Sequence, residues 1–419
     1  MNASSFNSVL FLRWLVISIA IGMAIAVALV IVVDPYGLYR VVNRPGLNLI
    51  KPGLTRYQNE IKLSHAIALR ADTFIMGNSR AEIGFDPDAS ALAQCCASRY
   101  NLAIPGIGID TSRRQLEYLL HVGIKPRLIV MGIDFLDFLA LPQKTPAAKT
   151  SADPSDAGYP IEQWLWRFDT LFSVASVKDA LRTLTIQHDA DAETISPSGF
   201  NPLHEYWSMA RNEGYYVLFR QREQENARTY LKLAKGALEL TDLSQLRAIL
   251  DMAARSESDL KLIIYPYHAQ ILALFEETGL WPAFEQWKDA VIGEVVAARR
   301  RHPDVHVALF DFSGYGSYNC EHIPAEGDRK TVTRWYWEAG HFKKELGDVV
   351  LDQVLSAPVN SRRIAGIGTD PASVFGMRLD ATTRTSNRQR IDRERAECLR
   401  VYPELFTETA ELVMRMRNR

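Results

Sequence analysis

Short apolar runs separated by longer amphipathic stretches constrain the fold of this chain more than any other feature. Five such runs are predicted to be buried strands, at residues 73–76, 100–104, 128–133, 260–265 and 305–312. Apolar residues at helical spacing lie between or after them, at residues 111–122, 243–254, 281–300 and 346–354. Strands connected through helices pair in parallel by right-handed crossovers. The sequence therefore predicts an α/β fold, a three-layer α/β/α domain with a five-stranded, mainly parallel sheet.

Residues 14–33 are twenty residues without a charge, between Arg13 and Asp34. As a helix rising about 1.5 Å per residue, this run is about 30 Å long, which matches the hydrocarbon core of a bilayer. Its C-terminal end is bulky and mostly β-branched, unlike the small residues of a signal-peptide cleavage site. We therefore expect an uncleaved transmembrane anchor, with a buried core helix as the alternative.

The charges around the anchor do not decide its orientation. Arg13 and the α-amino group precede it, and the basic residues that follow are Arg40, Arg44, Lys51 and Arg56. Read literally, the positive-inside rule leaves the large domain in the cytoplasm, but long domains translocate largely regardless of charge.

The chain divides into four segments by composition. Residues 1–34 hold the anchor, residues 35–138 and 243–357 the α/β domain, residues 139–242 a mainly helical insertion, and residues 358–419 an Arg-rich helical tail. We expect the insertion's aromatic residues, among them Trp164, Trp166 and Phe168, to be core, with a substrate platform as the alternative. Basic and acidic residues are interleaved in the tail, which predicts a solvated helix; contact with lipid headgroups or a partner is the alternative.

Charge and cysteine spacing exclude several classes of function. The net charge of −1 offers no basic surface, so we expect no nucleic-acid partner. No glycine-rich phosphate loop and no metal-ligand spacing occur, so we expect no metal and no cofactor. The cysteines are Cys95, Cys96, Cys320 and Cys398. Either one of the vicinal pair bridges to Cys320 in an oxidising compartment, or the thiols are free and buried.

The candidate nucleophile is Ser79, in the stretch Phe-Ile-Met-Gly-Asn-Ser-Arg at residues 74–80. A serine directly after a buried parallel strand lies at the carboxyl edge of the sheet, where open α/β folds bind ligands. Serine needs a neighbouring base and donors for the developing oxyanion. The plain alternative is that Ser79 caps a helix.

The candidate base is His341, with Glu338 three residues before it. This spacing lets the carboxylate fix the imidazole tautomer and leaves the other ring nitrogen for the serine. The alternative is that both residues cap the helix that starts nearby. His268 follows the fourth predicted strand and is either a substrate-binding or a structural histidine.

Together these pieces resemble the SGNH (GDSL-like) hydrolase superfamily, whose fold is flavodoxin-like. The family's first motif, Gly-Asp-Ser after the first strand, is matched by Gly-Asn-Ser at residues 77–79. Its last motif, Asp-x-x-His, is matched by Glu338 and His341 with Glu for Asp. Its second motif supplies a glycine N–H to the oxyanion hole, and Gly106 is similar in context. The resemblance implies that Ser79 is the nucleophile, His341 the base and Glu338 its orienting carboxylate.

The chain departs from the family at the third motif, Gly-x-Asn-Asp. Residues 132–135 read Gly-Ile-Asp-Phe, so no asparagine is present to donate to an oxyanion. Loss of one such donor typically costs about 10²–10³ in rate. The oxyanion would then depend on the N–H groups of Ser79 and Gly106, with Asn78 or Arg80 as further donors. Asp134 would be structural, or would hold Arg80.

The layout also resembles a narrower group of bacterial proteins with one N-terminal span and an SGNH-like domain. These act beside membrane-bound O-acyltransferases, as in alginate O-acetylation and teichoic-acid D-alanylation. The resemblance covers about residues 10–355. It implies a single-pass protein of the bacterial cytoplasmic membrane with its domain on the periplasmic or extracytoplasmic side. The implied partner is a membrane-bound O-acyltransferase.

The implied activity is that of a serine acyltransferase or esterase. Its substrate would be an acyl group, acetyl foremost, of a cell-surface or exported glycan, carried through a Ser79 acyl-enzyme. The alternative is a non-catalytic glycan-binding or assembly protein on a degenerate form of the fold, which Asp134 favours.

Overall fold

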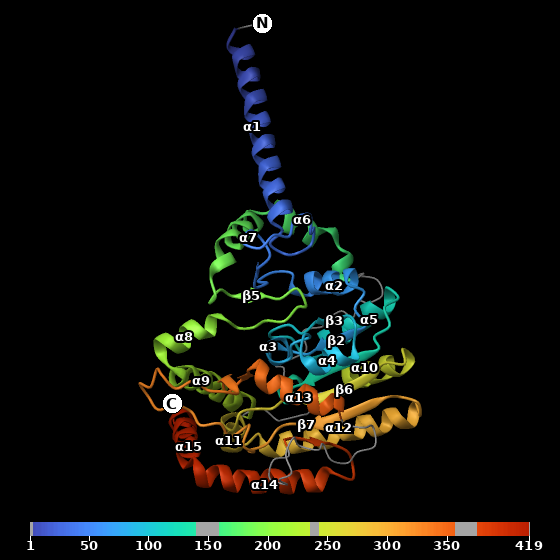
Figure 1. Ribbon diagram of the computed structural model, residues 1–419, viewed down its shortest axis with the longest axis vertical. Coiled ribbons are helices and arrows are strands. Elements are labelled where there is room, and N and C mark those ends of the chain that lie inside the picture. The colour runs from blue at the N-terminus through green and yellow to red at the C-terminus, as the bar shows by residue number, and fades with distance from the viewer. Residues whose placement is uncertain (1–2, 140–158, 235–242, 357–374, 419) are drawn as a thin grey trace. The chain divides into compact units, whose positions relative to one another are not determined.

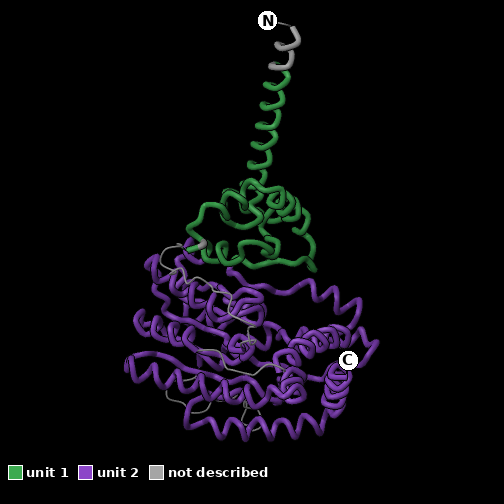
Figure 2. Tube along the Cα trace, turned by 180° about the vertical axis from the view of Figure 1, so that it is seen from behind, with its two compact units in different colours: residues 1–65, 152–197 green, residues 66–151, 198–419 purple. Residues whose placement is uncertain are grey.

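A computed structural model describes residues 3–139, 159–234, 243–356 and 375–418. The chain forms two compact units (Figure 2). One comprises residues 1–65 and 152–197, and the other residues 66–151 and 198–419. The predicted insertion is therefore divided between the two units, and the predicted tail belongs to the second.

The second unit is built on a six-stranded sheet with the order β10-β7-β6-β4-β2-β3 (Figure 1). The strands are β2 (Thr73–Met76), β3 (Arg99–Asn101), β4 (Leu128–Ile133), β6 (Asp259–Ile264), β7 (Val307–Asp311) and β10 (Met377–Arg378). The five predicted strands pair in parallel, which confirms the mostly parallel sheet. The short β10 adds an antiparallel edge that the sequence did not predict.

The strand order places a topological switch point between β2 and β4. The chain passes from β2 to the edge strand β3 and then returns to β4 on the other side of β2. Loops at the carboxyl ends of these two strands diverge, which leaves room for a ligand in open α/β sheets. Ser79 and Asp134 follow these two strands.

Helices cover the sheet, and its central strands are buried along their length. Every residue of β2, β4 and β7 is buried, so both faces of the sheet are covered. One packed group of helices is α5 (Ile109–His121), α10 (Ser244–Arg255) and α12 (Trp281–Arg301). A second is α3 (Ser79–Gly84), α4 (Ser90–Cys95) and α13 (Lys344–Ser356). Short 3₁₀ turns include η1 (Phe135–Phe138) after β4.

Further helices of this unit pack beside the sheet. Helices α8 (Glu205–Glu213) and α9 (Tyr215–Ala234) pack on each other, and α9 also contacts α11 (Ala269–Thr278). A two-strand hairpin, β8 (Tyr336–Glu338) and β9 (His341–Phe342), lies against α9 and α3. Because α9 belongs to the predicted insertion, that part of the insertion contributes to the core of the sheet unit.

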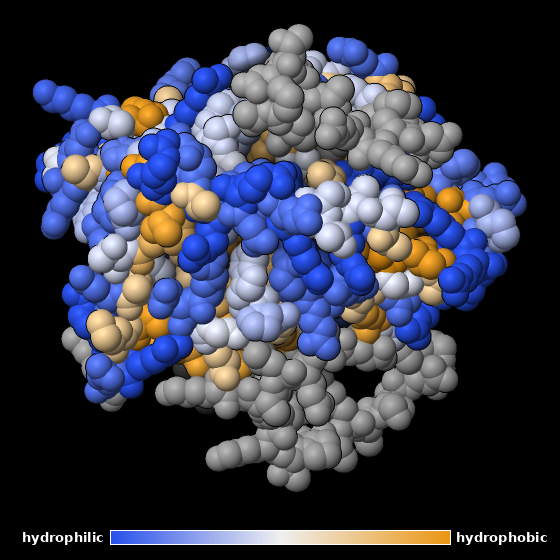
Figure 3. All heavy atoms as spheres, turned by 90° about the horizontal axis from the view of Figure 1, so that it is seen from below, coloured by the Kyte–Doolittle hydropathy of each residue, from blue (hydrophilic) through white to orange (hydrophobic). Residues whose placement is uncertain are grey.

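The Arg-rich tail forms α14 (Arg384–Val401) and α15 (Pro403–Arg417), and α14 has one docked face and one face exposed to solvent. Arg388 is paired with both Glu285 and Asp289 at 2.7 Å, and Arg395 is paired with Glu276. Arginines in these ion pairs are not available to bind lipid headgroups. The surface seen in Figure 3 is mostly hydrophilic, with its apolar residues in small separate patches.

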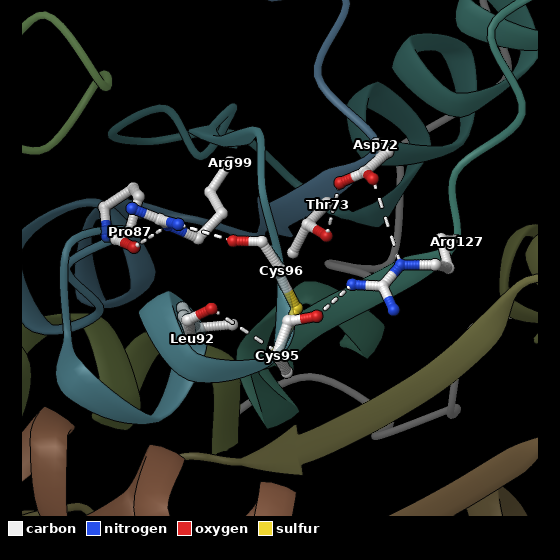
Figure 4. Close-up of a disulfide and its surroundings, with 8 residues drawn as sticks. All are labelled: Asp72, Thr73, Pro87, Leu92, Cys95, Cys96, Arg99 and Arg127. Carbon is white, nitrogen blue, oxygen red and sulfur yellow. Dashed lines mark hydrogen bonds and ion pairs between the residues drawn. A yellow bond between two sulfur atoms is a disulfide. The ribbon is translucent and has the colours of Figure 1, made fainter.

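Both expectations for the cysteines are wrong. Cys320 is bonded to Cys398 of α14, with their Cα atoms 6.0 Å apart, and Cys95 is bonded to its neighbour Cys96 (Figure 4). None of the four cysteines is free. The first bridge ties the tail to the loop after β7, a pairing that depends on where the tail folds back.

The first unit contains the N-terminal helix α1 (Ala3–Val33) and the helices α6 (Trp164–Phe172) and α7 (Val174–Thr185). Strands β1 (Lys51–Pro52) and β5 (Thr194–Ile195) pair antiparallel, and helix α2 (Gln58–Ala68) begins in this unit and ends in the other. Short 3₁₀ turns lie at η3 (Pro160–Glu162) and η4 (Ile186–His188).

Within α1, residues Leu10–Val33 are long and apolar enough to cross a membrane. Only 11% of the most apolar window is buried, which is not the pattern of a core helix. Directly after it, Asp34 is fully buried and accepts hydrogen bonds from the backbone N–H groups of Leu38, Tyr39 and Arg40. The end of the apolar helix is therefore held in a folded turn.

Candidate active site

The turn after β2 exposes Ser79 because Gly77 and Asn78 shape the backbone. Gly77 has a φ of +136°, and a Cβ atom there would lie 2.5 Å from the Tyr265 hydroxyl. Asn78 caps α3, since its side-chain oxygen accepts the Arg80 N–H at 3.1 Å. Ser79 is the first residue of the helix, so the alternative that Ser79 is the cap does not hold.

The structure brings the three predicted triad residues together. Ser79 Oγ lies 2.9 Å from His341 Nε2, although the two residues are 262 positions apart. The other ring nitrogen, Nδ1, is hydrogen-bonded to Glu338 Oε1. With the proton on Nδ1, Nε2 accepts from the serine hydroxyl, which is the state required of a general base.

The β8–β9 hairpin holds the base and its carboxylate in register. Glu338 ends β8 and pairs with His341, the first residue of β9. The second carboxylate oxygen of Glu338 accepts the Gly340 N–H at 2.6 Å. Glu338 is 1% exposed, whereas His341 and Ser79 are partly exposed. The reactive atoms face solvent, and the orienting group does not.

The electrostatics keep Glu338 ionised. Burial acts to raise the pKa of Glu338, but His341, Arg222 and the Gly340 N–H outweigh it, so the pKa lies below its ordinary value. Arg222 Nε lies 3.2 Å from Glu338 Oε1 as an ion pair, without the alignment of a hydrogen bond. An ionised Glu338 stabilises the imidazolium that forms when His341 takes the serine proton.

Asp134 holds Arg80, which was one of the two roles expected for it. The Arg80 guanidinium is ion-paired with Asp134 Oδ2, and Asn78 Nδ2 donates to the same oxygen at 3.1 Å. The other oxygen accepts from the Tyr267 hydroxyl at 3.0 Å and from the Leu136 N–H. Burial acts to lower the pKa of Arg80, but the charge of Asp134 outweighs it and raises the pKa.

The expected oxyanion donors differ in their surroundings. The Arg80 and Asn78 side chains each give one hydrogen bond to Asp134, and each has further N–H groups. Ser79 N–H, at the first position of α3, has no acceptor within the helix. Gly106 is exposed, with a φ of +72° in the loop between β3 and α5. The backbone N–H groups of Ser79 and Gly106 stay the first candidates for an oxyanion hole.

His268 is not brought to the site. It is 0% exposed and caps α11, with Nδ1 accepting the Gln270 N–H at 3.2 Å and Nε2 2.9 Å from the Glu321 carbonyl oxygen. Its ring packs edge-on against Phe219 and Tyr336. Burial lowers its pKa to about 4. Of the two roles considered for His268, the structure supports the structural one.

Sequence reasoning missed Arg222, Tyr267 and Asp137. Arg222 approaches Glu338 from α9, and nothing near it in the sequence signals that contact. Asp137 lies just after β4. A carboxylate close to the carboxyl end of a parallel strand could have been singled out as a candidate site residue. Asp137 lines a cavity of about 10 Å³ beside Gly77 and Gly132, room for about one water molecule. Burial and the charge of Asp134 raise its pKa to about 8.

A cavity of about 390 Å³ lies elsewhere in this unit. Residues of α9, α15 and the loop at 321–326 line it, and Ser79, Glu338 and His341 do not. Among the described residues, no group of His, Cys, Asp and Glu side chains could hold a metal ion. Comparison of the chain with protein-family models, curated proteins and solved structures gives no match. The geometry of Ser79, His341 and Glu338 is therefore the main indication of what this protein does.

Proposed function

We propose that this protein is a membrane-anchored serine acyltransferase or esterase that acts through an acyl-enzyme on Ser79. The observation that carries the proposal is the contact of Ser79 Oγ with His341 Nε2 at 2.9 Å, with Glu338 bonded to the other ring nitrogen. Hydroxyl, imidazole and buried carboxylate in this order form the arrangement that activates serine for attack on a carbonyl.

In the first step, Ser79 Oγ attacks the carbonyl carbon of an acyl ester, and His341 Nε2 takes the hydroxyl proton. Glu338 stabilises the resulting imidazolium, and the backbone N–H groups of Ser79 and Gly106 receive the negative charge on the carbonyl oxygen. The intermediate then collapses, the ester C–O bond breaks, and His341 returns the proton to the leaving alkoxide. The acyl group remains as an ester of Ser79.

In the second step, a hydroxyl group attacks the carbonyl carbon of the acyl-enzyme, and His341 Nε2 takes its proton. The bond from the acyl carbon to Ser79 Oγ then breaks, and His341 returns the proton to Ser79. Water as the acceptor gives hydrolysis, and a sugar hydroxyl gives transfer. The partial exposure of Ser79 and His341 supports a large acceptor, since a bulky chain needs access from the surface. On the resemblance described above, we propose an acetyl or other acyl group on a cell-surface or exported glycan as the substrate.

We infer the location of the protein and its partner from the same resemblance. The large domain would lie on the periplasmic or extracytoplasmic side of a bacterial membrane, beside a membrane-bound O-acyltransferase that supplies the acyl group. The Cys320–Cys398 bridge supports this side, because disulfides persist in oxidising compartments.

A fluorophosphonate probe tests the proposal on the full-length protein in detergent. We expect wild type to be labelled on Ser79, and labelling to disappear in Ser79→Ala and His341→Ala. Ser90→Ala is the matched control, because Ser90 is also the first residue of a short helix and is exposed. Incubation with p-nitrophenyl acetate should leave an acetyl group on the Ser79 peptide, detected by mass spectrometry.

The second candidate function is non-catalytic glycan binding or assembly, and Asp134 favours it. Its carboxylate stands where the family has a neutral donor, and it engages the Arg80 and Asn78 side chains. Folded wild-type protein that resists the probe at every concentration would contradict the enzyme and favour this second function. Labelling that persists in His341→Ala would contradict the triad.

A further inference from the structure

Helix α6 exposes a row of aromatic side chains to solvent. The exposed fractions of Trp164, Phe168 and Phe172 are 65%, 50% and 48%. These residues are four apart, so they lie above one another on one face of the helix. Their rings are in contact, with centroids 5.6 Å apart for the first pair and 4.5 Å for the second. The sequence predicted that Trp164 and Phe168 would be core, and that prediction is wrong.

The core of this unit uses the other face of α6. Trp166 is 4% exposed and Thr170 is 1% exposed, so the helix already has a buried side. Leu165 extends the exposed apolar surface beside Trp164, and Val174 extends it onto the start of α7, where it is 87% exposed. We call Trp164, Leu165, Phe168, Phe172 and Val174 the aromatic face. A contiguous exposed apolar surface in a soluble setting is costly and marks an interaction site.

The aromatic face lies beside the end of the helix that can cross a membrane. Helices α6 and α7 both contact α1 (Figure 1). Near the end of α1, Val30 and Val33 form a small core with Ala180 of α7. Leu171 of α6 packs against the same core. The apolar run of α1 ends at Val33, so these contacts fall where the span would leave the hydrocarbon.

We propose that the aromatic face lies in the interfacial zone of the bilayer that α1 crosses. Tryptophan and other amphipathic aromatics concentrate at this depth, and an amphipathic helix buries its apolar face about 5–10 Å into the headgroup boundary. Arg167 on α6 and Lys178 on α7 are exposed, and their charges suit lipid phosphates. The proposal rests on the span formed by α1 and is independent of the chemistry at Ser79.

The lipid surface is a better occupant than a second protein because the contact is imposed by the chain itself. Once α1 is inserted, its packing against α6 and α7 places the aromatic face close to the headgroups without any further partner. The first unit would then have two membrane contacts, the span and the aromatic face, and its tilt against the bilayer would be restricted.

Spin labelling tests this in the full-length protein reconstituted into vesicles of phosphatidylethanolamine and phosphatidylglycerol. Because the four native cysteines are paired, a thiol label attaches to one introduced cysteine, at Phe168→Cys. Ile19→Cys in the span is the lipid reference, and Val332→Cys, exposed on the sheet unit, is the aqueous reference. Accessibility to oxygen and to a water-soluble nickel complex gives the depth of each label.

We expect the Phe168→Cys label to favour oxygen, at a depth of about 5–10 Å below the phosphates. A label at Phe168 that matches the Val332 reference, while the Ile19 label reports lipid, would overturn the proposal. Protection in native membranes but not in pure lipid vesicles would also overturn it and indicate a protein partner. An aqueous Ile19 label would show that α1 does not span, and the proposal would fall with it.

A second measurement avoids a cysteine in the aromatic face. Trp164→Phe keeps an aromatic ring of similar shape, so the fold should be preserved. Brominated lipids should quench wild-type tryptophan fluorescence more strongly than that of the variant, and Trp207→Phe on α8 should leave the lipid-dependent quenching unchanged. Equal quenching of wild type and Trp164→Phe would contradict the proposed depth.

Discussion

Replacing Glu338 by Gln tests the triad through the tautomer of His341. In the wild type, one carboxylate oxygen accepts from His341 Nδ1–H and the other accepts the Gly340 N–H. An amide can accept only through its oxygen. If that oxygen keeps the Gly340 N–H, the amide NH₂ faces Nδ1, which must then be unprotonated. The proton moves to Nε2, which can no longer accept from Ser79.

The opposite amide orientation keeps an acceptor at Nδ1 and points NH₂ at the Gly340 N–H, whereas the first orientation points NH₂ at Arg222 Nε. Each orientation therefore sets a donor against a donor, and we expect Glu338→Gln to lose control of the tautomer and to lower kcat/KM about 10⁴-fold, the loss seen when such a carboxylate becomes an amide. This corresponds to about 5.5 kcal/mol of transition-state stabilisation. Ser79→Ala and His341→Ala should lose more, about 10⁶-fold.

The assay is hydrolysis of p-nitrophenyl acetate, together with the rate of fluorophosphonate labelling. Glu345→Gln is the matched control, because Glu345 is an exposed acid in the first turn of α13 and should leave both rates unchanged. Thermal unfolding checks that the variants remain folded. If folded Glu338→Gln retained activity within about tenfold of wild type, Glu338 would not be the orienting group.

Three further predictions concern titratable groups, two near the site and one at the buried His268. Asp134→Asn should lower the free energy of unfolding by about 3–5 kcal/mol in urea, because Arg80 stays buried without its partner. Asp137→Asn should instead raise the free energy of unfolding at pH 7, because the pKa of this carboxyl is about 8 in the folded protein and the unfolded chain gains by ionising it. Arg222→Gln should lower kcat/KM about fivefold, since an ion pair with one partly exposed partner contributes about 1 kcal/mol. An unchanged kcat/KM for p-nitrophenyl acetate would contradict a contribution of this ion pair to catalysis. The pKa of His268 in the folded protein is about 4. Between pH 6.5 and 4 the unfolded chain therefore binds a proton at His268 that the folded protein does not. The free energy of unfolding falls as the pH falls through this range. The loss reaches about 3 kcal/mol, and His268→Asn, which can keep the helix cap, should show a flatter dependence of unfolding free energy on pH.

The strands and the triad candidates could be predicted because they depend on local sequence. A mostly apolar run signals a buried strand, and β2, β4, β6 and β7 each lie in such a run. Strand β3, Arg-Tyr-Asn, covers only the start of the run predicted at residues 100–104. Ser79 follows such a run, so the position of a serine at the sheet edge was implied once the strand was recognised. Glu338 and His341 were paired by a three-residue spacing that the β8–β9 hairpin uses. The two-residue strand β10 had no such signal, because it is too short to carry a pattern.

Only the tertiary structure decided which distant groups meet. Arg222 reaches Glu338 because α9 packs on the hairpin, and Cys320 meets Cys398 because the tail folds back. Asp134 engages Arg80 and Asn78, residues that follow a different strand. The composition of α6 is that of a core helix, yet its aromatic face is exposed beside α1. The type of a residue determines how much its side chain is stabilised by burial or by a polar or charged partner. The packing of segments remote in the sequence determines which groups lie close enough to be that partner.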